Sequence, residues 1–525
     1  MRPDPRPPEH PLESSFAEEL RAVRPDLVPA FRRSLPGARA AVLARLWRSL
    51  RFEQLPGAER HRLDGPDLRG YEVGAPKDEY SVDLDGRRCT DPVALLNALG
   101  LVGGAGFAAE LEHSTASLAL SRAGAGAGAG AAVGPRRGGG LVGHEQSVVD
   151  GHPYHPCCRS RPGLGVADQL NHAPEHRPVV ELGLVPLEPA ACTVVGDWPE
   201  SLRDARGRLL LPAHPWQLRE VLPRLGFPGA VGSLAADPLM ALRTLAPVDG
   251  GPHIKTALSV RMTSSVRDIS GGSVLNSAPL SALLAAVTDR LGGDLVITRN
   301  LAAASAHTDA GGLSPDLAVL LRESPEIHAG PGERVLPLAS VTAVSGDPVA
   351  WLGALARLAW PPLLRLLSWG VALEAHGQNL LVVLDPRDRP LRLVYRDLAD
   401  VRVSPLRLAG IGVHPAGLTG HVLEDDPNQL RRKLLGSLLG GCLSSLVAQL
   451  GGGVRAVEDE LWAAVAEAAR EAAGVLAPED RRALLEQPLP VKALSRMRLD
   501  GQPPGDQWTL LPNPLAAAAS GKWDQ

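Results

Sequence analysis

Aromatic residues are scarce in this chain, where Phe, Trp and Tyr make up 3% of 525 residues. Cysteines are also few: the chain has five, which excludes the dense disulfide framework of a small secreted protein. No apolar stretch of about 18 uncharged residues is evident. Residues 351–373 come closest, but Arg357, Arg365 and a Pro-Pro pair interrupt them. The N-terminal MRPDPRPPEHPLESSF has no apolar signal-peptide core. We therefore expect a soluble, cytoplasmic protein.

The chain also has little net charge, −4 at neutral pH. This excludes a general attraction to nucleic acid or to anionic membranes, so we expect neither as a partner. Hydrophobic residues (44%) and charged residues (21%) are present in ordinary globular proportions. The length exceeds what one hydrophobic core supports, which predicts two or three domains.

Composition and periodicity predict a multidomain α+β protein with three regions. Residues 1–140 favour helices, with a low-complexity Ala/Gly segment at 121–140 that we interpret as a flexible surface insertion. Residues 141–345 contain short β-like runs, RPVVELGLVPL, HIKTALSVRMT and GDLVITRN, which indicate antiparallel strands within an α+β layer. Residues 346–525 favour helices apart from one hairpin.

That hairpin is the most informative element. LLVVL and LRLVY are apolar runs joined by DPRDRP, with EAHGQN before the first strand and YRDL after the second. Asn379 and Asp397 should therefore lie side by side, close to Glu374. Hard oxygen ligands of this kind suit Mg²⁺ on a nucleotide, and protein kinases use a comparable Asn and Asp. The alternative is that these residues only cap a helix and a loop.

A second motif, IKTALSVRMTSSVRDIS, is rich in cations and hydroxyls. Its alternation predicts a strand over 254–262 with Lys255 on one face. Thr263, Ser264 and Arg267 would then follow at a strand-to-helix turn suited to an anion. Upstream, Arg243 and Thr244 place another arginine beside a hydroxyl. A solvated face is the alternative, but three such clusters favour phosphate or carboxylate binding.

The segment GHPYHPCCRSRPGLG allows two interpretations. His152 and His155 with Cys157 and Cys158 suggest zinc, whereas the arginines that follow suggest the wall of an anion pocket. Adjacent cysteines chelate poorly, no second ligand pair is present, and arginines repel a cation, so zinc is disfavoured.

Taken together, the motifs resemble the NRPS-independent siderophore synthetases of the aerobactin-synthetase type. The family pattern GHPxHPxxKxRxG resembles residues 151–163, and HPWQ, S-x-R-T, K-x7-TS-x2-R and EAHxQN…RD follow in order. The closing VKALSRMRLDGQPPGDQWTLLPNPLA is also similar. The likeness spans roughly residues 140–515.

This resemblance implies a homodimeric, ATP- and Mg²⁺-dependent ligase. Such enzymes adenylate a carboxylate, such as citrate or a succinyl-type acid, and release pyrophosphate. An amine, hydroxylamine or alcohol then attacks to give an amide or ester. The implied fold is a cupped hand with thumb, fingers and a distantly kinase-like palm.

The resemblance also carries roles to particular residues. Those implied for the nucleotide are Arg243, Thr244, Lys255, Arg159, Ser160, Arg161, His376, Gln378, Asn379 and Asp397. Those implied for the carboxylate substrate are His152, His155, Thr263, Ser264, Arg267 and Gln378. The implied metal ligands are Glu374, Asn379 and Asp397. The residues closest to the chemistry would be Arg267, His376, His155 and Lys255.

Three positions depart from the family pattern. Arg159 stands where lysine is usual, Ala241 replaces the serine that opens S-x-R-T, and Arg299 stands where glutamate is expected. Two rival interpretations are a kinase-like small-molecule phosphotransferase and a non-catalytic nucleotide-binding paralogue.

Overall fold

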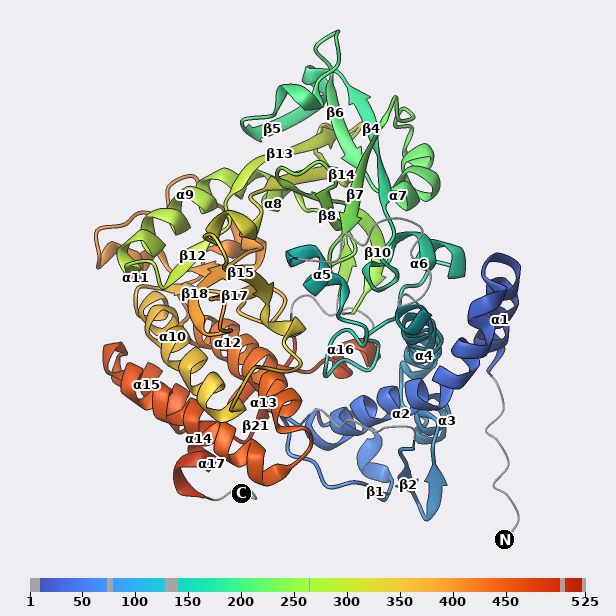
Figure 1. Cartoon of the computed structure of the whole chain (residues 1–525), viewed down its shortest axis with the longest axis vertical. Coiled ribbons are helices and arrows are strands. Elements are labelled where there is room, and N and C mark those ends of the chain that lie inside the picture. The colour runs from blue at the N-terminus through green and yellow to red at the C-terminus, as the bar shows by residue number, and fades with distance from the viewer. Residues whose placement is uncertain (1–9, 73–78, 128–139, 264, 501–505, 522–525) are drawn as a thin grey trace.

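The computed structural model describes most of the chain, and the statements below concern residues 10–72, 79–127, 140–263, 265–500 and 506–521. In Figure 1, blue N-terminal helices lie at lower right, a green sheet lies at the top, and orange and red C-terminal helices lie at lower left. The fold is mixed α/β, and its sheets are almost entirely antiparallel.

The N-terminal region combines helices with a small three-stranded sheet. Its elements are α1 (Pro11–Val23), α2 (Val28–Phe52), α3 (Pro92–Leu99), α4 (Gly104–Ala127), β1 (Leu63–Asp64), β2 (Val82–Leu84) and β3 (Arg87–Cys89). Helix α2 is buried on all sides from Gly37 to Ser49, and Phe31, Leu43, Trp47 and Phe107 meet in one core.

Helix α4 corrects the expectation of a flexible insertion starting at residue 121. The helix continues to Ala127, and Ser121 and Ala123 are buried. Alanine is a strong helix former, and tertiary packing outweighs the interspersed glycines. The rest of the predicted insertion, 128–139, lies outside the described residues.

The large sheet contains eight strands, and every neighbouring pair is antiparallel. In spatial order they are β5 (Cys192–Gly196), β13 (Asn300–His307), β14 (Leu313–Arg322), β9 (His253–Thr256), β8 (Thr244–Pro247), β7 (Ser233–Pro238), β4 (Val180–Leu187) and β6 (Leu209–Ala213). Thr244 lies opposite Lys255 on the two central strands. The cationic motif therefore lies at the middle of the sheet.

The predicted strand over 254–262 is in fact two strands. β9 stays in the large sheet, whereas β10 (Leu258–Met262) pairs with β11 (Ser265–Arg267) in a separate hairpin. Thr263 lies at the turn with a positive φ of 50°, which permits a tight reversal. The expected strand-to-helix turn is therefore wrong, because the next helix, α8, begins only at Gly271.

The C-terminal hairpin is confirmed: β17 (Leu380–Leu384) and β18 (Pro390–Tyr395) pair antiparallel. They belong to a four-stranded sheet in the order β12 (Leu295–Ile297), β18, β17, β15 (Arg334–Pro337). β12 runs parallel to β18. GDLVITRN therefore pairs with the hairpin, not with the antiparallel sheet predicted for it.

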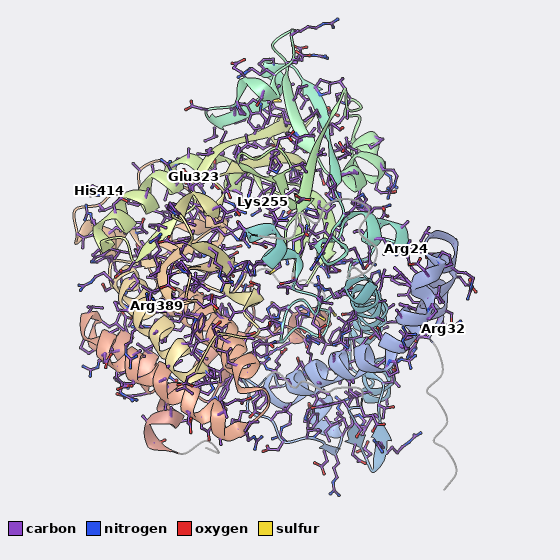
Figure 2. All side chains as sticks on the ribbon, viewed as in Figure 1. Arg24, Arg32, Lys255, Glu323, Arg389 and His414 are labelled. Atoms are coloured by element: carbon purple, nitrogen blue, oxygen red, sulfur yellow. The ribbon has the colours of Figure 1, made fainter. Side chains whose placement is uncertain are left out.

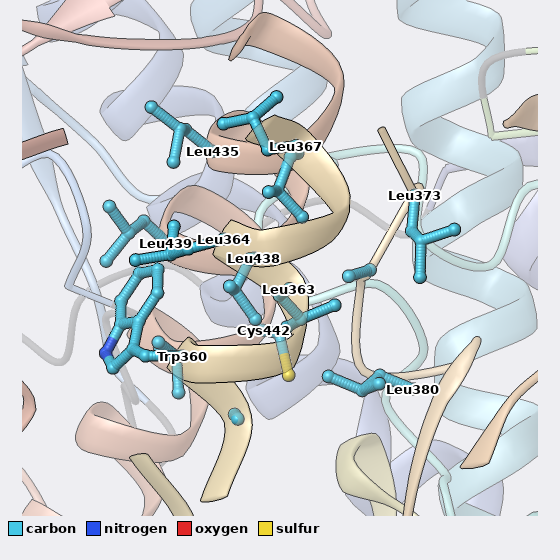
Figure 3. Packing of buried hydrophobic residues seen from close by; sticks show 14 of the residues in the cluster. Trp360, Leu363, Leu364, Leu367, Leu373, Leu380, Leu435, Leu438, Leu439 and Cys442 are labelled. Carbon is cyan, nitrogen blue, oxygen red and sulfur yellow. The ribbon is translucent and has the colours of Figure 1, made fainter. Parts of the chain in front are cut away.

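Helices surround this smaller sheet. They are α9 (Ser277–Thr288), α10 (Pro348–Ser368), α11 (Pro405–Ala409), α12 (Pro427–Ser437), α13 (Ser444–Gly451), α14 (Arg455–Ala472), α15 (Pro478–Leu485) and α17 (Pro514–Ser520). The remaining helix of this region, α16 (Arg496–Leu499), packs on the N-terminal helices instead. Figure 3 shows Trp360, Leu363 and Leu367 of α10 among the leucines of the α12 region. The core of this region also includes Leu280 of α9 and Leu295 of β12. The predicted domain boundaries at 140 and 345 stay predictions.

Shorter elements complete the description. They are α5 (Leu141–Gln146), α6 (Val166–His172), α7 (Pro215–Glu220), α8 (Gly271–Leu275), β16 (Val371–Ala372), β19 (Arg402–Val403), β20 (Leu489–Lys492) and β21 (Trp508–Leu511).

The α12–α13 rod, Pro427–Gly451, is the one described helical stretch long and apolar enough to cross a membrane, but 61% of its most apolar window is buried inside the protein. A core helix passes the same test. Glycines on this rod let β20 approach closely: a Cβ at Gly436 would lie 2.7 Å from the Pro490 carbonyl oxygen, and one at Gly440 would lie 2.5 Å from Val491. This packing fixes the position of Lys492.

The segment after β20 is anchored to the N-terminal region. Glu53, buried at the end of α2, accepts hydrogen bonds from the backbone N–H of Ser495 (2.7 Å) and of Arg496 (3.1 Å). Two of the N–H groups at the start of α16 are thereby satisfied. The C-terminal segment therefore bridges the N-terminal helices and the C-terminal core.

Candidate functional site

The centre of the large sheet meets the C-terminal hairpin through an ion pair. Lys255 Nζ, on β9, donates to Asp397 Oδ1 at 2.6 Å, and Asp397 is the aspartate of the RD that follows the hairpin. Burial acts to raise the pKa of Asp397, but Lys255 and Arg322 outweigh it and hold that pKa well below the usual range. The predicted juxtaposition of the two motifs is therefore observed (Figure 2 labels Lys255 on the sheet).

A further arginine, which sequence reasoning missed, faces the same carboxylate. Arg322 ends β14, is buried, and places Nη1 3.9 Å from Asp397 Oδ1. Its Nε is buried without a hydrogen-bond partner among the described residues. A buried donor of this kind is costly unless a ligand satisfies it. The available signal was an arginine closing the apolar run DLAVLLR.

The other predicted cations lie beside this pair. Arg243 Nη1 donates to the carbonyl oxygens of Arg267 and Asp268. Arg267 in turn donates from Nη2 to the Met262 carbonyl at 3.0 Å and to the hydroxyl of Thr263. Ser264 lies outside the described residues. The arginines thus hold the β10–β11 hairpin to the start of β8.

The pKa values of Lys255 and Arg243 are lowered, mainly by burial. Burial, reinforced by the charges of Arg243 and Arg322, lowers the pKa of Lys255 to about 8. Burial and then the charge of Arg267 lower the pKa of Arg243 to about 10. Burial disfavours the charged form of both groups despite the attraction of Asp397, so an added anion beside them is electrostatically favoured.

Backbone conformation is unusual at three points of the site. Leu242, Thr263 and Asp397 have positive φ angles of 66°, 50° and 66°. Such angles are uncommon for residues other than glycine, and they cluster where tertiary structure holds a functional geometry. Here they orient the residue before Arg243, the hairpin turn, and the carboxylate itself.

Glu374 lies in a different electrostatic environment from Asp397. Its Oε1 accepts from Lys433 Nζ at 3.2 Å and from Lys492 Nζ at 3.1 Å, two contacts that sequence reasoning missed. Burial acts to raise the pKa of Glu374, yet the two lysines hold it well below normal. Glu374 is also less exposed than Asp397, with 11% against 31% of the side chain accessible.

Asn379 and Asp397 suit a cation better than Glu374 does. Asn379 Nδ2 donates to the Glu374 carbonyl at 3.4 Å, which turns its amide oxygen the other way, and Asp397 is 31% exposed and anionic. Within the described residues, no three His, Cys, Asp or Glu side chains are grouped to hold a metal ion. Gln378 accepts a bond from Arg396 Nε through its backbone carbonyl at 3.0 Å.

The three candidate histidines are held neutral. Burial, followed by the charge of His376, lowers the pKa of His152 to about 3. Burial and then Arg498 place the pKa of His155 well below normal, and burial lowers that of His376 despite nearby Glu374. His155 Nδ1 accepts from Cys157 N at 3.0 Å, whereas its buried Nε2 has no hydrogen-bond partner in the described structure. Neutral imidazoles can accept a proton.

The arginines of the opening motif are occupied elsewhere. Arg161 donates to both oxygens of the fully buried Glu175, at 2.8 and 3.2 Å, and Arg159 lies 3.6 Å from the same carboxylate. Arg159 also donates to the carbonyls of Val148 and Val149. Cys157 and Cys158 belong to the N-terminal core. This segment is built as structure, and the zinc interpretation finds no support in it.

The departures from the family pattern fall near the edges of this arrangement. Arg299 donates to Glu323 and is 58% exposed, so its charge is balanced by the residue after Arg322. Ala241 offers no hydroxyl near Arg243.

Arg396, next to Asp397, forms a buried ion pair with Glu145 of α5 at 2.5 Å and thereby fixes the end of the hairpin.

Two family models match the chain. Residues 141–343 match the IucA / IucC family, and residues 349–505 match the family described as ferric iron reductase FhuF-like transporter. The first range contains the cationic strands and the second contains the hairpin end with Asp397.

Curated relatives are distant. The uncharacterized protein y4xN of Sinorhizobium fredii is 27% identical over 71% of each chain. The citryl-spermidine/3,4-dihydroxybenzoyl-citryl-spermidine:spermidine ligase of Bacillus anthracis is 24% identical over 48% of this chain and 50% of its own. The staphyloferrin A synthase of Staphylococcus aureus is 24% identical over 50% and 53%. The chain thus spans about half the length of these two named enzymes.

Solved structures share the fold over nearly the whole chain. The petrobactin biosynthesis protein AsbB from Bacillus anthracis superposes with a TM-score of 0.75 and 18% identity, covering 97% of this chain and 99% of that one. The ATP-bound aerobactin synthetase IucA from Klebsiella pneumoniae gives 0.73 and 19%, covering 91% and 99%.

Proposed function

The chain belongs to the NRPS-independent siderophore synthetases of the aerobactin type, and from that premise we propose that it activates a carboxylic acid with ATP and joins it to an amine. The Lys255–Asp397 contact carries this proposal, because it brings surplus cations against the end of the hairpin. In this proposal, the N-terminal helices, the eight-stranded sheet and the C-terminal helices are the thumb, fingers and kinase-like palm.

The nucleotide lies between the central strands and the hairpin end. Its phosphates replace part of the Lys255–Asp397 contact and take the donors of Lys255, Arg243 and Arg322. The lowered pKa of Lys255 (burial, then neighbouring cations) returns toward normal once an anion is bound. The sheet position of Thr244 opposite Lys255 places a hydroxyl on the same strands.

The carboxylate substrate binds beside Arg267. One of its oxygens attacks the α-phosphorus of ATP, the bond to the β-phosphate oxygen breaks, and pyrophosphate leaves with the electron pair. Two anions must approach each other in this step, so fixed cations stabilise the transition state more than the separate reactants. Thr263 and Arg267 are already mutually oriented by their hydrogen bond.

Magnesium fits the Asp397 and Asn379 side chains, and when bound it would neutralise charge on the phosphates. Glu374 is better assigned to positioning Lys492 and Lys433. These ammonium groups supply positive charge on the hairpin side of the site.

The second step needs a neutral nucleophile. Its nitrogen attacks the acyl carbon, AMP leaves, and one proton must be taken from the nitrogen. His155 and His376 are neutral imidazoles near Arg267 and Glu374, which makes them candidate acceptors. The citryl-spermidine:spermidine ligase among the relatives supports an acid–amine product.

The decisive experiment supplies ATP, magnesium and a panel of acids, including citrate and succinate, with hydroxylamine as trap. We expect acid-dependent release of AMP and pyrophosphate together with a hydroxamate. Release of ADP together with a phosphorylated acceptor would instead identify a phosphotransferase. No nucleotide turnover with any acid would contradict the proposed function.

A further inference from the structure

The strand that carries Lys255 leaves the large sheet just before the β10–β11 hairpin. The Ala257 N–H still donates to the Ala318 carbonyl oxygen of β14, at 3.1 Å. Two residues further along, the same antiparallel register would place the Ser259 N–H against the carbonyl oxygen of Asp316. Asp316 belongs to β14, yet β10 pairs with β11 instead. Some other group must therefore satisfy these two backbone atoms.

The side-chain amide of Gln217 lies between Ser259 and Asp316. Its Oε1 accepts the Ser259 N–H at 2.9 Å, and its Nε2 donates to the Asp316 carbonyl oxygen, also at 2.9 Å. The Ser259 hydroxyl joins the same network, because it accepts from Gln217 Nε2 at 2.8 Å and donates to Asp316 Oδ1 at 2.5 Å. Gln217 is 0% exposed, so a buried amide replaces one backbone pair of the ladder.

Helix α7, which begins within the HPWQ segment, holds Gln217 in this place. His214 caps the helix, since its Nδ1 accepts the Trp216 N–H at 3.2 Å. The Trp216 Nε1 donates to the Gly163 carbonyl oxygen at 2.9 Å, and its ring packs with Leu258 of β10 in one buried cluster. The helix therefore lies fixed against β10 (Figure 1), with its amide between the two strands.

The separation of the strands affects one half of the site more than the other. β10 is followed by β11, in which Arg267 lies directly opposite Leu258, so the place of Arg267 depends on where β10 leaves β14. Lys255 lies before that point, and backbone pairing with β8 and β14 holds it. Loss of the Gln217 amide should therefore displace the proposed acid-binding group and leave Lys255 in place.

We propose that Gln217 is a positioning residue whose side-chain amide separates β10 from β14 and thereby sets the place of Arg267 relative to Lys255. It acts through the backbone of β10. Its importance for the reaction rests on the proposed function, whereas its role in separating the strands does not.

The test compares Gln217→Met with the wild-type protein. Methionine still fills the space between the strands, but the Ser259 N–H and the Asp316 carbonyl lose their partner. With the acid of the panel that supports the fastest pyrophosphate release, we expect KM for the acid to rise about tenfold. KM for ATP should stay within about twofold of wild type. Equal rises in the two KM values, or no rise in either, would overturn the proposal.

The matched control is Gln169→Met on α6. Gln169 is also 0% exposed, and its Nε2 donates to Ser117 Oγ at 3.0 Å and to the Leu164 carbonyl oxygen at 3.2 Å. The same substitution there removes a buried amide away from β10, and it should change neither KM value. A tenfold rise in KM for the acid in this control would contradict the proposal.

Trp216→Phe serves if Gln217→Met does not fold. It keeps an aromatic ring in the cluster and removes the hydrogen bond that anchors α7 to Gly163. KM for the acid should rise about two- to threefold, with KM for ATP unchanged. Unchanged or equally shifted values would overturn the proposal.

Hydrogen exchange separates the two levels of inference, because it needs no substrate. In Gln217→Met, peptides that cover β10 and β11 should exchange about tenfold faster than in the wild-type protein, whereas β9 and β14 exchange as before. If no acid supported pyrophosphate release, the proposed function would fail, yet this local change would still support the role of Gln217. Faster exchange across the whole sheet, or no change in β10, would refute it.

Discussion

Two clusters of basic residues in this molecule differ in what surrounds them. Arg159 and Arg161 close on Glu175, whose side chain is 0% exposed. Lys255 and Arg322 face Asp397, whose side chain is 31% exposed. In the first cluster the charges are paired and sealed from water, which suits a structural role. In the second, cations are in excess and the carboxylate is accessible, which suits binding of an anion.

The largest effect that would sharpen this comparison is on stability. Glu175→Gln leaves two buried arginines without a counter-charge, and we expect a loss of about 3–5 kcal/mol of unfolding free energy. Urea denaturation measures it. The folded fraction should keep its KM for ATP. A raised KM with unchanged stability would instead return Arg159 and Arg161 to the nucleotide site that the family resemblance implies.

In the second cluster the large effect should fall on activity. Arg267→Ala and Asp397→Asn should lower acid-dependent pyrophosphate release by about 100-fold or more, because each removes a charge aimed at the reacting groups. Asparagine tolerates the left-handed backbone at position 397, so the turn should survive. Thermal unfolding within a few degrees of wild type is the control, and normal turnover in either variant would contradict the assigned site.

A smaller effect concerns pH. Burial and neighbouring cations place the pKa of Lys255 at about 8, below its ordinary value of 10.5. ATP affinity should therefore be steady below about pH 8 and fall as Lys255 loses its proton above it. Between these two pKa values the unfolded chain binds more protons, so the contribution of Lys255 to stability rises with pH there. KM for ATP measured against pH checks this, and Lys255→Arg should flatten the profile because arginine stays charged. A slope retained in that variant would assign the titration to another group.

The smallest expected effect comes from restoring a hydroxyl. Ala241→Ser should tighten ATP binding by about 1 kcal/mol, the usual net contribution of one hydrogen bond. Nucleotide titration calorimetry measures it, with Ala241→Val as a size control. Equal affinities in all three proteins would show that position 241 does not reach the phosphates.

Sequence patterns predicted those parts of the fold that neighbouring residues determine. The hairpin of β17 and β18 follows from two apolar runs and a turn within 380–395, and it is observed. The single strand predicted over 254–262 is wrong. The alternation of side chains continues through Ala257, but the chain leaves one sheet for another there. Periodicity records which face is buried but not which sheet buries it.

The candidate site could be predicted only in part for a similar reason. Motif order indicated that Lys255 and Asp397 belong together, and their side chains meet across 142 positions. The partners of Arg161 and Glu374 were not predicted. Glu175 and Lys433 stand in segments without a chemical pattern, and Lys492 stands in the closing VKALSRMRLD segment, which indicates no partner for it. Whether an arginine is paired or in surplus is a property of tertiary packing.

The hydrogen bonds between Glu53 and the start of α16 have a consequence for the order in which the protein folds during synthesis. The strands bearing Lys255 and Arg322 are synthesised long before Lys492 of β20, which contacts Glu374, and before Ser495, which contacts Glu53. A nascent chain that ends before Lys492 would have Glu374 paired with Lys433 alone, so its site would be incomplete. The ability to bind nucleotide should therefore appear late in synthesis, after the segment at Ser495 has packed against the N-terminal helices.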